Sequence, residues 1–133
     1  MSLKDKKKRA GRLKRKRSLR KKLNGSAERP RVSVYRSNRN IYAQLVNDDH
    51  YSEDGQHLGG LTLAASSSKH EVTCDVPEEI SGKCATAYQV GRALADKAKE
   101  RGVDSIVFDR SGYLYHGRVA ALARGLRDGG IKF

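Results

Sequence analysis

The sequence predicts an α/β protein, a mixed β-sheet with helices packed on it, preceded by a basic N-terminal helical arm. Positive charge is concentrated before residue 23, three strand-like segments follow, and two helical periods after residue 83 flank a short apolar run. The order after the arm is βββαβα, and the helix joining the third strand to the fourth implies a parallel crossover. We divide the 133 residues into the arm, residues 1–24, and one globular domain, residues 25–133.

The arm holds most of the net charge of +13. Residues 1–22 contain 13 of the 28 Lys and Arg but only one of the 15 acids, Asp5, so the rest of the chain carries about +1. Residues 4–23 are rich in helix formers and lack proline, yet like charges oppose a helix in water. We expect the arm to be frayed when free and helical once anions neutralise it, with a stop at Asn24-Gly25.

Three strands are expected next. Residues 31–37 and 40–48 alternate apolar and polar positions around the turn-forming sequence SNRN, which predicts a hairpin. Residues 50–60 are polar and contain glycine, so we expect a loop before a third strand at 61–66. Residues 67–82 have no sustained period and are expected to be irregular.

The last elements are two helices around one strand. Residues 83–101 repeat apolar side chains at helical spacing and end at Gly102, and residues 104–109 form a short apolar run typical of a buried parallel strand. A final helix begins near Val119, with apolar positions at i, i+3, i+4 and i+7, and Gly129-Gly130 closes it.

Several classes of protein are disfavoured. No apolar run of 18 residues exists and the N-terminus lacks an apolar core, so we expect neither a membrane span nor a secretory signal. Cys74 and Cys84 are the only cysteines and no metal-ligand spacing occurs, so we expect reduced cytoplasmic thiols, no metal and no cofactor.

The arm predicts a polyanionic partner, and nucleic acid is the commonest one; such binding weakens steeply with salt. A solvated tail, a localisation signal and an anionic-membrane patch are alternatives, but the arm lacks the Trp, Phe or leucine face that a membrane helix inserts. The candidate contacts in the arm are Lys4, Lys6, Lys7, Lys8, Arg9, Arg12, Lys14, Arg15, Lys16, Arg17, Arg20, Lys21 and Lys22.

The predicted hairpin turn adds donors that suit phosphate and sugar oxygens, although a plain surface turn fits as well. Tyr35 and Tyr42 beside it could stack on bases or pack in the sheet. The candidate contacts in this turn are Arg36, Ser37, Asn38 and Arg39, and Arg31, at the start of the first predicted strand, is a further candidate.

The stretch FDRSGYLYHGRV, residues 108–119, could be a catalytic loop or a binding loop. A Ser111–His116–Asp109 triad would be squeezed into one short loop, and metal-dependent nucleases need several converging carboxylates that the first strand lacks. We therefore expect no enzyme. Asp109 can instead bind loop amides or pair with Arg110.

A binding role fits the rest of this stretch better. Gly112 permits a tight turn, the start of the last helix favours a phosphate, and the flat side chains suit RNA, although the tyrosines could equally cover the end of the sheet. The candidate contacts are Tyr113, Tyr115, His116, Gly117 and Arg118.

These residues resemble the family of bacterial large-subunit ribosomal protein eighteen. FDRSGYLYHGRVAALARGLRDGGIKF at 108–133 is similar to its C-terminal motif, residues 29–48 to its first hairpin, residues 87–110 to its middle helix and strand, and the arm to its N-terminal extension. The resemblance implies a sheet of ribonuclease H-like type without that fold's catalytic carboxylates.

It also implies a cytoplasmic, ribosome-bound constituent of the large subunit that binds 5S rRNA and helps attach it to 23S rRNA in the central protuberance, beside ribosomal protein five. No small-molecule substrate or membrane is implied. A general nucleic-acid chaperone and a nuclease of related fold are the alternatives. Residues 49–83 depart from the family pattern, and the acids Glu53, Asp54, Glu78 and Glu79 point to solvent or a protein neighbour there.

Overall fold

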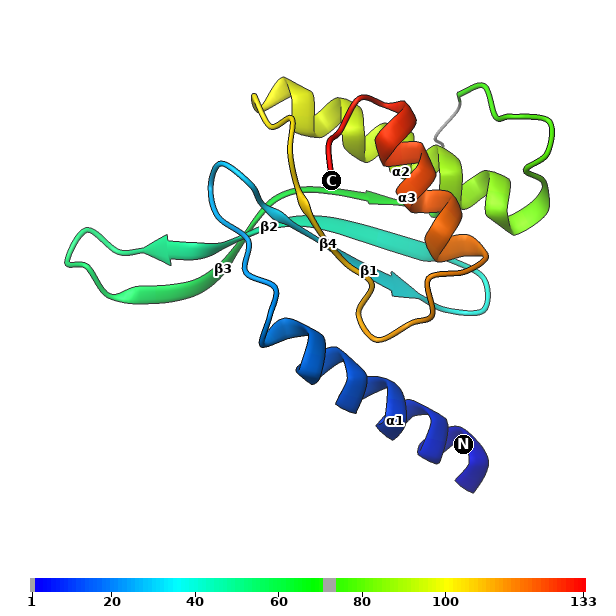
Figure 1. Ribbon diagram of the computed structural model, residues 1–133, viewed down its shortest axis with the longest axis horizontal. Coiled ribbons are helices and arrows are strands. Elements are labelled where there is room, and N and C mark those ends of the chain that lie inside the picture. Colours follow the sequence, from blue (N-terminus) through cyan, green and yellow to red (C-terminus); the bar gives the residue numbers. More distant parts are fainter. Residues whose placement is uncertain (1, 71–73) are drawn as a thin grey trace.

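The computed structural model describes residues 2–70 and 74–133, and a four-stranded sheet forms its centre (Figure 1). The elements are α1 (Leu3–Arg20), β1 (Arg31–Arg36), β2 (Ile41–Tyr51), β3 (His57–Ser67), α2 (Gly82–Glu100), β4 (Val107–Asp109) and α3 (Arg118–Asp128). The strand order is β3-β2-β1-β4, with β1 antiparallel to β2 and parallel to β4. The mixed sheet, the order βββαβα and the parallel crossover are thereby confirmed.

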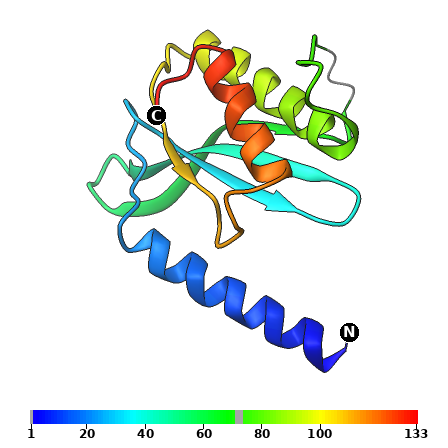
Figure 2. The same cartoon turned by 45° about the vertical axis from the view of Figure 1, so that its right-hand side comes forward.

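Helices α2 and α3 cover one face of the sheet (Figure 2), and the core lies between these two helices and the sheet. Val32 and Val34 of β1 face Leu94 of α2 and Leu122 of α3 in one cluster, and all four are at most 2% exposed. The alternation predicted for β1 and the helical periods predicted for α2 and α3 therefore mark the faces that are buried.

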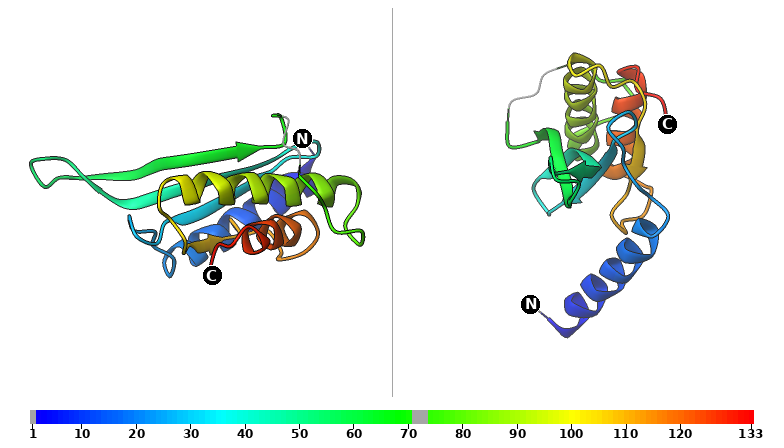
Figure 3. Two further views of the ribbon diagram at one scale, coloured as in Figure 1. Left: turned by 90° about the horizontal axis from the view of Figure 1, so that it is seen from above. Right: turned by 90° about the vertical axis from the view of Figure 1, so that its left-hand side faces the viewer.

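The hairpin of β2 and β3 is longer than predicted. Residues 50–60 were expected to form a loop, but only 52–56 connect the strands, and the two strands continue as a projecting ribbon (Figure 3, left). The β2–β3 ladder contains register shifts between Asn47 and Tyr51, and Gly59 on the opposite strand has a φ of +85°. Such irregularities let polar and glycine residues remain in a strand, which hides it from periodicity.

Two smaller segments differ in extent. Of the residues expected to be strand at 104–109, only Val107–Asp109 pair along β1, while Ser105 forms an isolated bridge to Lys132. Ser67 belongs to β3 and Gly82 to α2; the described part of 68–81 contains no helix or strand, and residues 71–73 lie outside the described residues.

Helix α1 lies on the opposite side of the sheet from α2 and α3 (Figure 3, right). It forms over Leu3–Arg20, and Ser2 Oγ caps it by accepting from the amide of Asp5. None of the described helices is long and apolar enough to span a bilayer. The ribonuclease H-like type and the division at residue 24 both stay predictions.

Candidate nucleic-acid interface

Asp109 ends β4 and organises the loop that follows it. Its side chain is fully buried; Oδ1 accepts from the amide of Ser111 at 2.8 Å, and Oδ2 lies 2.9 Å from Arg31 Nη1 and 3.4 Å from Arg20 Nε. Of the two partners weighed from the sequence, the loop amide is confirmed. Arg110 forms no ion pair with Asp109 in the described part of the chain; its Nη1 donates to the carbonyl oxygen of Tyr113. The carboxylate therefore joins strand, loop and arm.

Arg31 lies inside the fold, between two carboxylates. Besides Asp109, it makes a bidentate pair with Asp48, at 2.9 Å and 3.0 Å, and its residue is only 8% exposed. The hydrogen bond from Arg31 holds the pKa of Asp48 below its usual value, and the same bond raises the pKa of Arg31. In this conformation the guanidinium of Arg31 holds β1, β2 and β4 together and is not presented to a partner.

Tyr113 is likewise part of the framework. Its ring lies between two guanidinium groups, 4.6 Å from Arg12 of α1 and 4.9 Å from Arg36 at the end of β1, and it is 7% exposed. Its hydroxyl donates to the carbonyl oxygen of Arg36 and accepts from the Arg36 amide. The structure thus favours the alternative weighed for this tyrosine, that it covers the end of the sheet.

Two arginine side chains of the arm donate to backbone carbonyl oxygens of this loop. Arg12 Nη1 donates to the carbonyl oxygen of Ser111 and Arg15 Nε to that of Gly112, each at 3.1 Å. Gly112 has a φ of +79°, and a Cβ there would overlap the carbonyl oxygen of Arg12 and lie 2.9 Å from the amide of Lys16. The absence of a side chain at Gly112 therefore allows the backbone of α1 to lie directly against the loop after β4.

Burial has an electrostatic consequence in the docked helix. Burial against the body, and then the positive charges of Arg20 and Arg12, lower the pKa of Lys16, although Asp109 acts in the opposite direction. The cations on this side of α1 are therefore crowded together, which favours any anion that approaches them.

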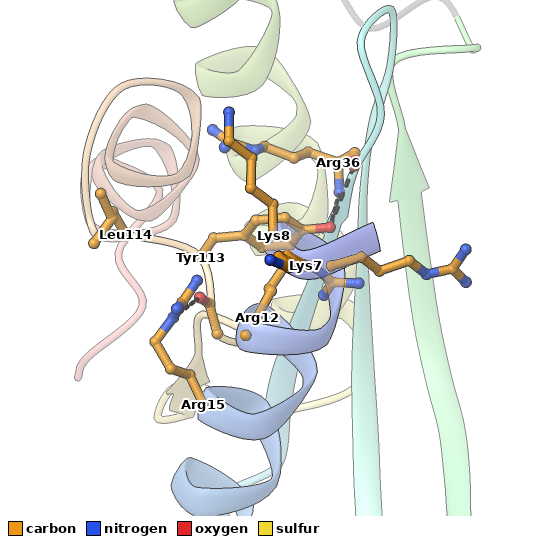
Figure 4. A pocket seen from close by; sticks show the side chains of 10 residues that line it. Lys7, Lys8, Arg12, Arg15, Arg36, Tyr113 and Leu114 are labelled. Atoms are coloured by element: carbon orange, nitrogen blue, oxygen red, sulfur yellow. Dashed lines mark hydrogen bonds between the residues drawn. The ribbon is translucent and has the colours of Figure 1, made fainter. Parts of the chain in front are cut away.

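A cleft of about 450 Å³ opens between α1 and the loop after β4 (Figure 4). Its walls contain six cationic side chains and no carboxylate; they are Lys7, Lys8, Arg9, Arg12, Arg15 and Arg36, and Gly11, Gly112, Tyr113 and Leu114 complete the lining. Guanidinium groups held in place by Tyr113 can donate to phosphate oxygens without further ordering. We call this feature the cationic cleft.

A second, smaller group of cations lies where α2 and α3 begin. Arg39, Lys83 and Arg118 line one pocket of about 40 Å³, and Lys83 Nζ donates to the carbonyl oxygen of Asn38. Lys83 was not among the candidates, because one lysine at a helix start carries no signal in the sequence. Ser37 closes the turn by hydrogen bonding with Asn40, while Asn38 and Arg39 are exposed.

The remaining candidates are divided by exposure. Tyr115 is 49% exposed; its ring meets Phe108 edge-on and its hydroxyl accepts from Arg127. His116 is exposed and Gly117, with a φ of +58°, precedes α3. Lys16 and Arg12 are the half-buried cations of the arm, and the exposed ones are Lys4, Lys6, Lys7, Lys8, Arg9, Lys14, Arg15, Arg17, Arg20, Lys21 and Lys22.

Asp109 and Ser111 of the loop after β4 are engaged in contacts within the fold. Asp109 is enclosed by Arg31 and the Ser111 amide, and the Ser111 hydroxyl lies 3.4 Å from that of Ser33. Among residues 2–70 and 74–133, no three His, Cys, Asp or Glu side chains gather as ligands for a metal ion. The geometry therefore supports contact with an extended polyanion along one side of the molecule.

Comparison with known proteins gives a consistent family. Residues 6–133 match the sequence profile described as ribosomal L18 of archaea, bacteria, mitochondria and chloroplasts. Proteins called large ribosomal subunit protein uL18 are 47% identical in Lactobacillus acidophilus, 48% in Lactobacillus johnsonii and 46% in Staphylococcus haemolyticus. Each of these matches spans 122 residues and covers 92% of both chains.

Proposed function

The chain belongs to the ribosomal L18 family, and from this membership we propose that it is a structural protein of the large ribosomal subunit that binds 5S rRNA and helps attach it to 23S rRNA in the central protuberance. Ribosomal protein five is its proposed neighbour, the cytoplasmic ribosome its location, and it carries out no reaction. The observation that carries the RNA contact is the cationic cleft, whose six cations come from two distant parts of the chain and face no carboxylate.

The cleft supports recognition by shape. A phosphate backbone that follows the arm would meet the exposed cations of α1 and then those of the cleft, while Arg39, Lys83 and Arg118 offer a second point of contact beyond Tyr113. Phosphate contacts of this kind fix position and orientation and read no base sequence. Selectivity for one RNA would then come from the distance between the two groups of cations, which suits a folded RNA.

Competition binding tests the proposal. Labelled 5S rRNA bound to the full chain is challenged with unlabelled 5S rRNA or with bulk transfer RNA at matched salt. We expect 5S rRNA to compete at a concentration at least about tenfold lower, since non-specific contacts lack the matched spacing. Equal competition would indicate a general nucleic-acid chaperone, and magnesium-dependent cleavage that survives further purification would indicate a nuclease.

A further inference from the structure

The β2–β3 ribbon, residues 47–61, differs in charge from the rest of the molecule. It contains Asp48, Asp49, Glu53 and Asp54 but no Lys or Arg, so its formal charge is −4. Because the whole chain carries +13, the remaining residues together carry +17. It projects beyond the sheet, away from the N-terminal end of α1 (Figures 1 and 3). A ribbon of this charge repels phosphates, so it is unsuited to the contact proposed for the arm.

The edge of this ribbon is open to a further strand. β3 is an outer strand of the sheet, and no strand within the described part of the chain pairs with its free edge. Its 11 residues include no Lys, Arg, Asp, Glu or Pro, side chains that protect many edge strands, and the edge protection it does have is the irregularity at Gly59, whose φ is +85°. Among the described residues, one helix side chain donates to the backbone of β3: Lys97, at Ala65, which lies outside the projecting half, residues 57–61.

Apolar side chains are exposed along the same segment. Leu58 is 53% exposed, Leu61 41% and Tyr51 55%, and Tyr51 lies against His57 across the ladder with 5.1 Å between ring centroids. The tip is a tight turn, in which the Ser52 amide donates to Gln56 and the Gly55 amide to Ser52. The ribbon therefore has a fixed tip and an apolar, unpaired edge beside acids.

We propose that the outer edge of β3, at residues 57–61, binds an extended, lysine- or arginine-bearing segment of another protein, which adds to the sheet as a fifth strand. Main-chain hydrogen bonds to the open edge and burial of Leu58 and Leu61 give the affinity. Glu53 and Asp54, which form no ion pair within the described residues, select a basic segment and exclude RNA. This inference goes beyond the 5S rRNA contact and does not depend on it.

Photocrosslinking of the full chain in its own cells tests the proposal. A photoreactive amino acid replaces Leu58 in one version and Leu114, which is 72% exposed in the cationic cleft, in the other. We expect the Leu58 version to join a Lys- or Arg-rich peptide of one protein, mapped by mass spectrometry, and the Leu114 version to join RNA. Crosslinks from residue 58 to RNA, to a second copy of this chain, or to nothing while residue 114 reacts would each overturn the proposal.

Charge variants make the result specific. Glu53→Gln with Asp54→Asn should lower the yield of the residue-58 crosslink roughly threefold or more, as expected for two exposed charge pairs. The matched control is Glu78→Gln with Glu100→Gln, which removes the same charge from other exposed positions and should leave the yield unchanged. Equal losses in both variants would show that the ribbon acids do not select the partner. Co-sedimentation with ribosomes, measured in parallel, reports on the proposed function separately.

Discussion

At the scale of single residues, Gly112 decides whether the arm docks. Gly112→Ala adds a Cβ that overlaps the Arg12 carbonyl oxygen, and it imposes the cost of a positive φ, about 1–2 kcal/mol. We expect limited proteolysis to cut the arm faster and 5S rRNA affinity to fall. Gly55→Ala is the control, since Gly55 has a φ of +82° with nothing within 4 Å of the added Cβ. If both variants behave alike, backbone strain and not the contact with Arg12 explains the effect.

The pKa of Asp48 makes a second residue testable. Because Arg31 lowers that pKa in the folded chain, the carboxylate stabilises the fold above its unfolded pKa of about 3.9, and this stability is lost as pH falls through the lower folded value. Asp48→Asn should reduce the free energy of unfolding by about 2 kcal/mol at pH 7. The difference from the unsubstituted chain should shrink below about pH 4.

Chemical denaturation at a series of pH values measures this difference. Asp54→Asn serves as the control, because Asp54 is exposed in the tip of the ribbon and forms no ion pair among the described residues. If the difference in free energy of unfolding between Asp48→Asn and the unsubstituted chain stays constant from pH 7 to pH 3, the role assigned to the Arg31–Asp48 pair is contradicted.

Residue roles were harder to predict than residue positions. Tyr113 and Arg31 were both predicted to contact RNA, but a sequence does not show which side chain meets a partner from far along the chain. Arg12 and Tyr113 are about 100 positions apart, and Arg31 and Asp109 are 78 apart. Such pairs depend on the tertiary arrangement, so exposed and internal cations look the same in the sequence.

At the scale of elements, two glycines in helices should respond in opposite ways to alanine. Gly125 of α3 lies against α2, where a Cβ would overlap the carbonyl oxygen of Tyr88 and lie 3.1 Å from the amide of Arg92. Gly11 of α1 has only the far end of Arg15 within 3.4 Å. Gly125→Ala should lower the free energy of unfolding by about 1–3 kcal/mol, as overpacking does.

Gly11→Ala should instead raise the helix content of the arm, since alanine is favoured over glycine in a helix interior by about 0.8–1.0 kcal/mol. Circular dichroism and thermal unfolding of the two variants measure both effects. A stabilising Gly125→Ala would mean that α2 and α3 pack less closely than the structure has them.

Elements with a clear period were predictable, and irregular ones were not. The faces of β1, α2 and α3 followed from spacing alone, because one side of each is buried. The outer part of the β2–β3 ribbon was predicted as a loop, because a strand exposed on both faces and interrupted by register shifts has no hydrophobic period. The same exposure that hid this ribbon from sequence analysis makes it a candidate for a partner.

At the scale of the whole molecule, the cations of the arm fall into two groups: some contact the loop after β4, and the others are exposed to solvent. The sequence showed the cationic arm, but it did not show that the arm lies against the loop after β4 and forms one wall of a cleft. Arg12 and Arg15 hydrogen-bond to the loop and hold the helix in place, whereas Lys14, Arg17 and Lys21 are exposed. Arg12 and Arg15 should therefore determine where the arm lies. Lys14, Arg17 and Lys21 should determine how many phosphates the arm neutralises.

The salt dependence of binding separates these two roles. Replacing Lys14, Arg17 and Lys21 by Gln should reduce the slope of log K against log salt for 5S rRNA by about 2–3, since each neutralised phosphate contributes about 0.7–0.9. Proteolysis of the arm should not change. The matched control replaces Lys99, Arg101 and Lys132 by Gln. Lys99 and Arg101 are exposed at the C-terminal end of α2, and Lys132 is exposed near the C-terminus of the chain. It removes the same charge, so an equal loss of slope would show that net charge, and not its placement on the arm, determines binding.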